Sequence, residues 1–274
     1  MGECDVQGDS DLYGGGVRYG LYMQWAATLL ATLFDQRNEN ALRSANLAIQ
    51  VSIFIGLCLE SGAGHPVANA VITQYLFIGS LSSVTGDGIS YVASFAGLMR
   101  SAFYLALSAY GIWFWSVGVD VMSAPGCAAH EIAFLGSITV HGRFRKFGIA
   151  ASCIGLVVCI ALTARGLVLV ARRFQKGVRS GLLGDSNGGG QLERPRVDVG
   201  LLALSIALMV FSIVLIEHLV GVNQVDVDEG DSFSVGQAIP FFMGTLSATV
   251  TFWNSLAVLL KWQKRCWFFM TIHL

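Results

Sequence analysis

Residues Val199–Ile216 have the sequence VGLLALSIALMVFSIVLI, in which no side chain is charged. At about 1.5 Å of rise per helical residue, a helix of this length can cross the roughly 30 Å hydrocarbon core of a bilayer. The stretch Ser101–Val119 is equally free of charge. Stretches of this kind decide the solvent in which the chain folds, and they predict a membrane protein.

The composition of the whole chain supports the same conclusion. Hydrophobic residues make up 54% of the 274 residues and charged residues only 13%, which is about half the charged share of typical soluble domains. A soluble helical protein of this size needs more charge on its surface, whereas a surface that faces lipid does not. The net charge of −1 gives no general attraction to nucleic acid, so we expect no nucleic-acid partner.

Short polar segments separate seven apolar stretches along the chain. Only helices and closed barrels satisfy their backbone groups in lipid. The continuous runs of Leu, Ala, Ile and Val favour helices over the alternating strands of a barrel. We therefore expect an all-α membrane protein, a bundle of about seven transmembrane helices, near residues 17–34, 44–60, 66–84, 99–119, 147–170, 199–219 and 236–260. The apolar segment 89–99 is either an interfacial lead-in or part of a span.

Basic residues in loops indicate the orientation, because they gather on the cytosolic side. With the N-terminus exoplasmic and the C-terminus cytosolic, twelve basic loop residues are cytosolic and four are exoplasmic. The cytosolic residues are Arg37, Arg43, Arg100, Arg172, Arg173, Lys176, Arg179, Arg194, Arg196, Lys261, Lys264 and Arg265, and the exoplasmic residues are Arg18, Arg143, Arg145 and Lys146. We expect this heptahelical, N-out orientation.

The orientation divides the chain into five segments. They are an exoplasmic acidic leader (1–16), spans one to five (17–171), a flexible basic cytosolic loop (172–198), spans six and seven with an acidic exoplasmic loop at 222–235 (199–260), and a short basic cytosolic tail (261–274). The expected partners are the lipid bilayer and, at the basic cytosolic loop, anionic lipid. The sequence leaves protein partners open, and it does not distinguish the plasma membrane from an endomembrane.

Two tracts carry a resemblance to a known group of proteins. The first, DLYGGGVRYGLYMQW, runs from Asp11 to Trp25, and the second, GQAIPF, runs from Gly236 to Phe241. Together they resemble an uncharacterised fungal family of multi-spanning integral membrane proteins, in which D-L-Y-G-x-G-V-R opens the first helix and G-Q-x-I-P opens the last. The resemblance implies seven spans and no particular activity. This chain departs from the pattern after the sixth span, where Glu217 stands in place of a basic residue followed by Trp and Asn.

Polar side chains at helix ends and inside spans are the candidates for a functional or interhelical role. An ion pair from Asp11 or Glu217 to Arg18 would tie the exoplasmic ends of helices together. Gly16 and Gly20 stand four residues apart and allow another helix to approach closely. The full candidate set is Asp11, Arg18, Gln24, Gln50, Gln74, Glu217, His218, Gln237 and Asn254.

Two cysteines are predicted to lie on the oxidising side of the membrane. Cys4 and Cys127 both fall in exoplasmic segments, so we predict that they form a disulfide. Cys58, Cys153 and Cys159 fall within spans and are expected to pack as small apolar residues.

The sequence narrows the functional class without fixing it. No H-x-x-x-H or H-E-x-x-H motif occurs, so we expect no catalytic residues, no metal site and no cofactor, and a membrane-embedded hydrolase is the least favoured class. Seven helices with an exoplasmic N-terminus favour a receptor-like, sensor or scaffold role. The alternative is a small-solute transporter or channel, for which Pro240 would break the last helix and free carbonyls to line a path. A polar cavity near Gln50, Gln74 and Asn254 would support transport.

Overall fold

The computed structural model describes residues 8–34, 36–62, 65–83, 95–122, 131–133, 137–183, 199–222 and 234–272. Within these residues the chain is helical, apart from one antiparallel hairpin of two short strands, β1 (Glu131–Ala133) and β2 (Ser137–Thr139). The long helices are α2 (Gly15–Phe34), α3 (Gln36–Glu60), α4 (Val67–Ser80), α5 (Phe95–Trp113), α7 (Arg145–Leu183), α8 (Val199–Val222) and α9 (Val235–Ile272). The short elements are α1 (Ser10–Tyr13), the 3-10 turn η1 (Leu81–Ser83), the π-helical turns η3 (Phe114–Gly118) and η4 (Val140–Phe144), and α6 (Val119–Met122).

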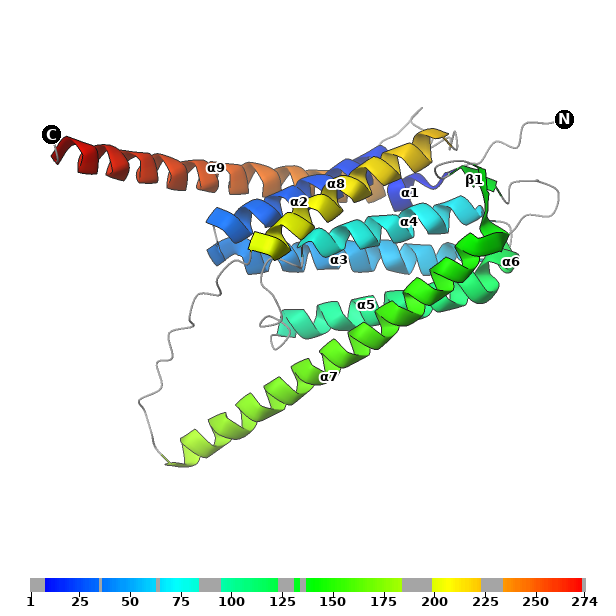
Figure 1. Ribbon diagram of the computed structural model, residues 1–274, viewed down its shortest axis with the longest axis horizontal. Helices are drawn as coiled ribbons and strands as arrows, with labels where there is room; N and C mark the ends of the chain where they lie inside the picture. The colour runs from blue at the N-terminus through cyan, green and yellow to red at the C-terminus, as the bar shows by residue number, and fades with distance from the viewer. Residues whose placement is uncertain are drawn as a thin grey trace.

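Each of the seven expected spans coincides with one of these long helices. The sixth, expected at 199–219, is α8. Of the segment 89–99, residues 95–99 belong to α5, which begins at Phe95, and residues 89–94 lie outside the described part of the chain. Successive long helices run in alternating directions, so that α1 and the last turns of α9 lie at opposite ends of the bundle (Figure 1). We call these ends the amino end, where α1 lies, and the carboxyl end, where α9 finishes.

Five of the long helices are long and apolar enough to cross a membrane, namely α3, the continuous helix from α5 to α6, α7, α8 and α9. The chain is therefore a multi-spanning membrane protein by the length and composition of its described helices. The two remaining long helices, α2 and α4, are the most enclosed. Eleven of the fourteen residues of α4 and twelve of the twenty residues of α2 are buried. Neighbouring helices cover both of them, and α4, with 14 residues, is also shorter than a helix that crosses a membrane by itself.

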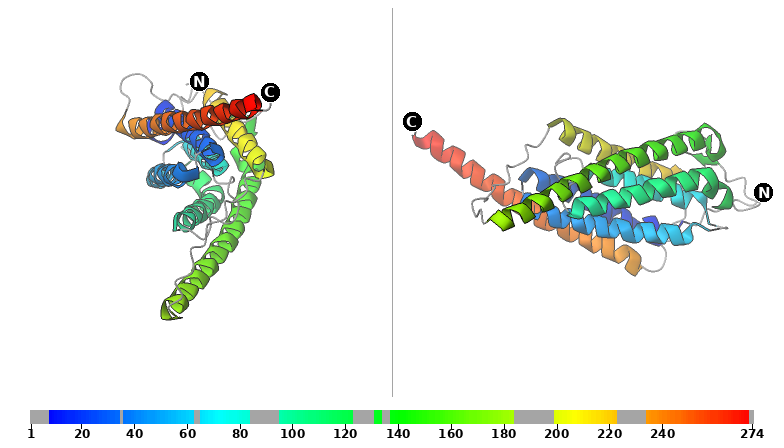
Figure 2. Two further views of the ribbon diagram at one scale, coloured as in Figure 1. Left: turned by 90° about the vertical axis from the view of Figure 1, so that its left-hand side faces the viewer. Right: turned by 90° about the horizontal axis from the view of Figure 1, so that it is seen from below.

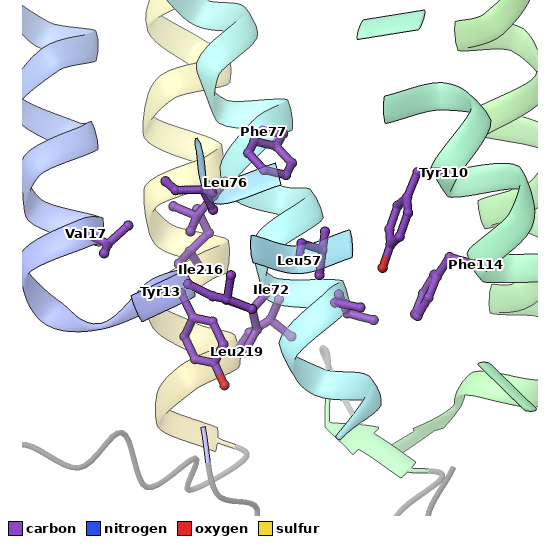
Figure 3. Close-up of a cluster of buried hydrophobic side chains, with 14 of the residues drawn as sticks. Tyr13, Val17, Leu57, Ile72, Leu76, Phe77, Tyr110, Phe114, Ile216 and Leu219 are labelled. Atoms are coloured by element: carbon purple, nitrogen blue, oxygen red, sulfur yellow. The ribbon is translucent and has the colours of Figure 1, made fainter. Parts of the chain in front are cut away.

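A hydrophobic cluster holds the centre of the bundle together (Figure 3). Its side chains come from α1, α2, α3, α4, α5, η3, α6 and α8, and include Tyr13, Val17, Leu57, Ile72, Leu76, Phe77, Tyr110, Phe114, Ile216 and Leu219. Aromatic rings join helices within it, for example Phe77 and Phe103, whose ring centroids lie 5.5 Å apart in an edge-on arrangement. Among the described residues, α9 contributes no side chain to this cluster. The core therefore belongs to the inner helices, and α9 lies outside it.

The helix α9 is instead attached through a close contact with α2. A methyl group on Gly20 would lie 2.3 Å from the carbonyl oxygen of Pro240, and one on Gly244 would lie 2.2 Å from the carbonyl oxygen of Gly20. The expectation that Gly20 allows another helix to approach is therefore confirmed. Pro240 lies inside a continuous α9, so the break expected at this residue is absent. Its carbonyl packs on α2 and does not line a path.

Two helices are much longer than a bilayer requires. The 39 residues of α7 and the 38 residues of α9 correspond to lengths of about 58 and 57 Å. Both run beyond the other helices at the carboxyl end, and α7 also diverges from the bundle there (Figures 1 and 2). The expected flexible loop at 172–198 is accordingly helical in its first part, because α7 continues to Leu183. Its Arg, Lys, Gln and Leu residues are good helix formers, and the run of three glycines comes later, at 188–190.

The start of α7 is clamped to the preceding helix at the amino end. The Arg145 guanidinium donates to both carboxylate oxygens of Asp120, at 3.1 and 2.8 Å, and its Nε donates to the carbonyl of Trp115 at 2.6 Å. Such a two-point contact fixes the orientation of the guanidinium relative to the carboxylate and also pairs their charges. Thus α7 is held firmly where it begins.

Candidate functional site

The two sequence tracts that open the first and last spans contact each other at the amino end. The Ser234 hydroxyl donates to the Asp11 carboxylate, and the backbone N–H of Gly16 donates to Oε1 of Gln237 at 3.4 Å. A methyl group on Gly236 would lie 2.5 Å from Oδ1 of Asp11, so the approach requires a glycine there. Asp11 and Gln237, far apart in sequence, therefore belong to one contact between α1, α2 and the start of α9.

Arg18 and Glu217 form the ion pair expected from the sequence. Nη1 of Arg18 lies 3.6 Å from Oε2 of Glu217, and the Tyr22 hydroxyl donates to Oε1 of Glu217 at 3.0 Å. Arg18 is only 6% exposed, and its Nε and Nη1 atoms make no hydrogen bond to any described residue. Among the described residues, Arg18 pairs with Glu217 and not with Asp11, which accepts from Ser234. We call Asp11, Arg18, Tyr22, Glu217 and Gln237 the polar junction.

A further hydrogen bond fixes α1 beneath the polar junction. The Tyr13 hydroxyl donates to Oδ1 of Asn69, on α4, at 2.6 Å. Burial raises the pKa of the Tyr13 phenol above its ordinary value, so the hydroxyl keeps its proton and remains a donor. Both side chains are buried. This contact is structural, because it satisfies two polar groups that would otherwise be costly to bury.

The polar side chains in the middle of the spans do not converge on one polar cavity. Nε2 of Gln50 donates to Oδ1 of Asn46 at 2.8 Å, and Nδ2 of Asn46 donates to the Ser83 hydroxyl at 3.2 Å. All three are buried. Gln50 is thus paired in a dry core, whereas Asn254 lies half-buried on α9.

Two other candidates, Gln24 and His218, lie outside this network of hydrogen bonds in the described part of the chain. Gln24 is 2% exposed, and neither atom of its side-chain amide has a hydrogen-bond partner among the described residues. His218 is half-buried next to Glu217. In the part of the chain that the structure describes, no three His, Cys, Asp or Glu side chains cluster as metal ligands would.

Buried charge also occurs at the carboxyl end, where sequence reasoning assigned Arg43 and Arg100 to cytosolic loops. Arg43 is 1% exposed and forms an ion pair with Glu39, which also accepts from Thr32. Nη2 of Arg100 donates to the carbonyl of Arg43 at 3.4 Å, which links α5 to α3. The spacing of Glu39 and Arg43 by four residues is a signal for a helical ion pair, but nothing in it indicates burial.

A cavity lies between α4, α5 and α7, and we call it the groove. Its volume is about 420 Å³. The lining is mostly apolar, and its residues include Val71, Gln74, Phe77, Ile78, Leu81, Gly97, Arg100, Tyr104, Leu107, Gly111, Trp115, Phe147, Gly148, Ser152, Gly155 and Leu162. Of the sequence candidates, only Gln74 lines it. Gln74 Nε2 and the Tyr104 hydroxyl are buried and have no hydrogen-bond partner among the described residues.

Small residues let α5 and α7 approach each other along one side of the groove. A methyl group on Gly111 would lie 2.5 Å from the Ser152 hydroxyl oxygen, and one on Gly148 would lie 2.5 Å from the Trp115 ring. In contrast to the contact of α2 with α9, the neighbouring atoms here belong to side chains. Sequence reasoning did not find the groove, since its three helices are not marked as neighbours by any local pattern.

The cysteine predictions are only partly within the described residues. Cys58, Cys153 and Cys159 carry free thiols, but Cys58 and Cys153 are exposed on the helix surface and only Cys159 is half-buried, so the packing expected for all three is not seen for the first two. Cys4 and Cys127 lie outside the described residues, so their disulfide stays a prediction.

Comparison with known proteins gives no relative from which a function could be transferred. No protein-family model, curated protein or solved structure matches the chain.

Proposed function

We propose that this chain is a seven-span, N-out membrane protein that acts as a receptor-like sensor of an apolar ligand held in the groove. The observation that carries the proposal is the groove itself, a mostly apolar cavity of about 420 Å³. Its size and lining are typical of sites for small molecules. It lies beside α7, which is clamped at its start by Arg145 and diverges from the bundle at the carboxyl end. A ligand between α5 and α7 would therefore change the position of α7 on the cytosolic side.

The arrangement of charge supports the N-out orientation. The extended carboxyl-terminal parts of α7 and α9 carry basic sequence, including Arg172, Arg173 and Lys261, as cytosolic segments do. At the opposite end, Arg18 and Arg145 are paired with the carboxylates of Glu217 and Asp120. This pairing offsets part of the positive charge that argues against an exoplasmic amino end.

Membership of the fungal family is part of this proposal. The two tracts that carry the resemblance contact each other at Gly16 and Gln237 and again at Gly20 and Pro240. This supports the interpretation that both tracts serve one structural unit, the attachment of the last helix to the first. The unit is a scaffold, and the ligand site that we propose lies elsewhere in the bundle.

Transport of a small solute is the second candidate. Gln24, a buried amide without a described partner, is the observation that favours it. Against it, Gln50 is paired with Asn46 and α9 is continuous through Pro240. A path for a polar solute needs polar groups that face a shared aqueous space, and the groove is mainly apolar.

The orientation is tested by placing an epitope tag before residue 1 and a second tag after residue 274, in separate copies of the full chain. In intact cells, or in sealed vesicles if the protein resides in an endomembrane, the first tag should be exoplasmic and the second cytosolic. The reverse result, or two tags on one side, would overturn the orientation. Alkaline carbonate extraction is the control for membrane integration.

The sensor function is tested by measuring the distance between α3 and α7 at the carboxyl end. Spin labels are attached to Ala41→Cys and Leu167→Cys, both at exposed positions, in a cysteine-free full chain reconstituted in lipid nanodiscs. The probes are oleic acid, ricinoleic acid, oleyl alcohol and cholesterol. We expect at least one probe to shift this distance by several ångströms. A control pair, Leu33→Cys with Ala41→Cys, reports on α2 and α3 and should not change. Absence of any shift with all four probes would overturn the sensor function.

A further inference from the structure

The groove extends along most of the length of two helices. On α5 its lining runs from Gly97 to Trp115, and on α7 from Phe147 to Leu162. At about 1.5 Å of rise per residue, these stretches are about 27 and 22 Å long. A volume of about 420 Å³ spread over this length leaves a narrow space. Such a space suits one extended hydrocarbon chain better than a rigid system of fused rings.

One charged side chain lines the groove in the described part of the chain, and the protein itself engages it. Arg100 is 7% exposed, its Nη2 donates to the carbonyl of Arg43 at 3.4 Å, and it takes part in at least one further interaction. An anion in the groove would have to displace these contacts, and a cation would meet Arg100 with no lining carboxylate to balance it. Because an ionised group buried without a partner is costly, the groove suits an uncharged ligand.

One amide in the groove determines the polar group that a ligand needs. Gln74 lines the groove, and its Nε2 is buried and makes no hydrogen bond to a described residue. Buried polar groups are usually satisfied, and an amide NH₂ can only donate. A ligand must therefore bring an acceptor oxygen to Gln74. The hydroxyl of Tyr104 is in the same condition, but a hydroxyl can either donate or accept, so it does not fix the chemistry of the ligand.

The surroundings of Gln74 favour a small oxygen group. Val71 and Ile78, which lie one turn before and one turn after Gln74 on α4, line the groove with apolar side chains. A large polar headgroup would bury several hydroxyl or phosphate oxygens against them without partners, which is costly. A single hydroxyl, carbonyl or ether oxygen supplies the acceptor and adds little other polar surface.

We propose that the groove binds an uncharged lipid that has one long hydrocarbon chain and one small oxygen group, such as a fatty alcohol. The oxygen accepts a hydrogen bond from Nε2 of Gln74, and the chain lies along α5 and α7. This inference rests on the proposed function, since it names the ligand class of the same groove.

The test compares oleyl alcohol with the matching octadecene, which has the same chain and lacks the hydroxyl. Each lipid competes with a photoreactive oleyl alcohol that carries a diazirine in its chain, on the full chain in nanodiscs, and affinities are expressed per mole fraction in the bilayer. We expect the alcohol to compete about fivefold more effectively, as one net hydrogen bond implies. The competed label should lie on α4, α5 or α7. Equal competition by the two lipids, or competed label on α8 alone, would overturn the inference.

Oleyl methyl ether tests which partner donates the hydrogen bond. Its oxygen can accept and cannot donate, so it should compete about as well as the alcohol if Gln74 is the donor. An ether that competes no better than the octadecene would overturn donation from Gln74.

The variant Gln74→Leu removes the donor and keeps a side chain of similar size. Its preference for the alcohol over the octadecene should fall to about one, while its affinity for the octadecene stays the same. Gln24→Leu is the matched control. Gln24 is also a buried amide without a described partner, but it lies on α2 and does not line the groove. An equal loss in both variants, or a loss in Tyr104→Phe and none in Gln74→Leu, would overturn the assignment of the donor.

The charge and shape of the ligand are tested on the unmodified chain, which avoids any effect of a substitution on folding. Oleyl sulfate and oleyltrimethylammonium keep the chain and carry a charge at every pH. Both should compete at least about tenfold more weakly than the alcohol, and cholesterol, which is uncharged but rigid, should also compete weakly. Competition by any of the three that equals that of the alcohol would overturn the ligand class.

The outcomes separate this inference from the proposed function. If oleyl alcohol and the octadecene compete equally and any probe shifts the spin-label distance of α7, the ligand class is wrong and the sensor stands. If the alcohol binds with the expected preference but no probe shifts α7, the ligand class stands and the sensor is wrong. If none of these lipids competes, the ligand class is overturned, and the effect of oleic acid and cholesterol on α7 decides the sensor.

Discussion

The helix pairs α2–α9 and α5–α7 are joined by small residues, but the atoms that meet are of different kinds. In the first pair, the backbone of α2 at Gly20 meets the backbone of α9 at Pro240 and at Gly244. In the second, Gly111 and Gly148 face the side chains of Ser152 and Trp115. A backbone atom cannot give way, whereas a side chain can rotate. The contact between α2 and α9, which we call the first seam, is therefore rigid. The contact between α5 and α7, the second seam, can adapt to a ligand in the groove beside it.

The largest effect is expected for Gly20→Ala. The added methyl group would lie 2.3 Å from the Pro240 carbonyl oxygen, so α9 must move away from α2. We expect a loss of about 3 kcal/mol in the free energy of unfolding, measured as a lower thermal midpoint of the purified chain. Gly221→Ala is the control, because no atom lies within 4 Å of its added methyl group. Equal effects of the two substitutions would contradict a rigid seam.

A smaller effect is expected for Gly148→Ala in the second seam. The methyl group would meet the Trp115 ring at 2.5 Å, but the ring borders the groove and can turn into it. We expect a cost of about 1–2 kcal/mol together with weaker binding of oleyl alcohol, because the ring then occupies part of the groove. Gly155→Ala, which meets only the Ser108 hydroxyl at 3.1 Å, should cost less. If Gly148→Ala destabilises the chain as strongly as Gly20→Ala does, the contact between α5 and α7 is equally rigid.

The smallest effect is expected for Glu217→Gln at the polar junction. The side chain of Glu217 is 39% exposed and its contact with Arg18 is 3.6 Å, so solvent screens much of the attraction. We expect a loss of about 1 kcal/mol, since Arg18 remains buried without its counter-charge. A double-mutant cycle with Arg18→Gln measures the coupling of the pair. A coupling near zero would mean that the ion pair does not hold α8 against α2 at this end.

The sequence predicted the features that depend on local pattern. Apolar length located every long helix, as with the expected span at 199–219 and α8 at Val199–Val222. Charge at the helix ends predicted the pair of Arg18 and Glu217, and residue size predicted the contact at Gly20. Each of these features depends on the residues of only one or two helices.

The features that sequence reasoning missed depend on which helices are neighbours. Gln74 and Tyr104 lie on different helices, and only the packing of α4, α5 and α7 brings both into the groove. The burial of Arg43 and Arg100 likewise requires α3 and α5 to meet. Pro240 was expected to break α9, but a proline near the start of a helix removes one hydrogen bond and the rest of the helix continues.

Because α7 is longer than a bilayer requires, a small rotation at its start produces a large displacement at its end. Between its clamp at Arg145 and its last residue, Leu183, the helix is a rod of 38 residue steps, or about 57 Å. Pivoting such a rod by about 5° at the clamp sweeps its tip through about 5 Å, while the part beside the groove moves by about half as much or less. A displacement no larger than a rotamer change of Trp115 is thereby magnified at the far end of α7, where this helix runs beyond the bundle.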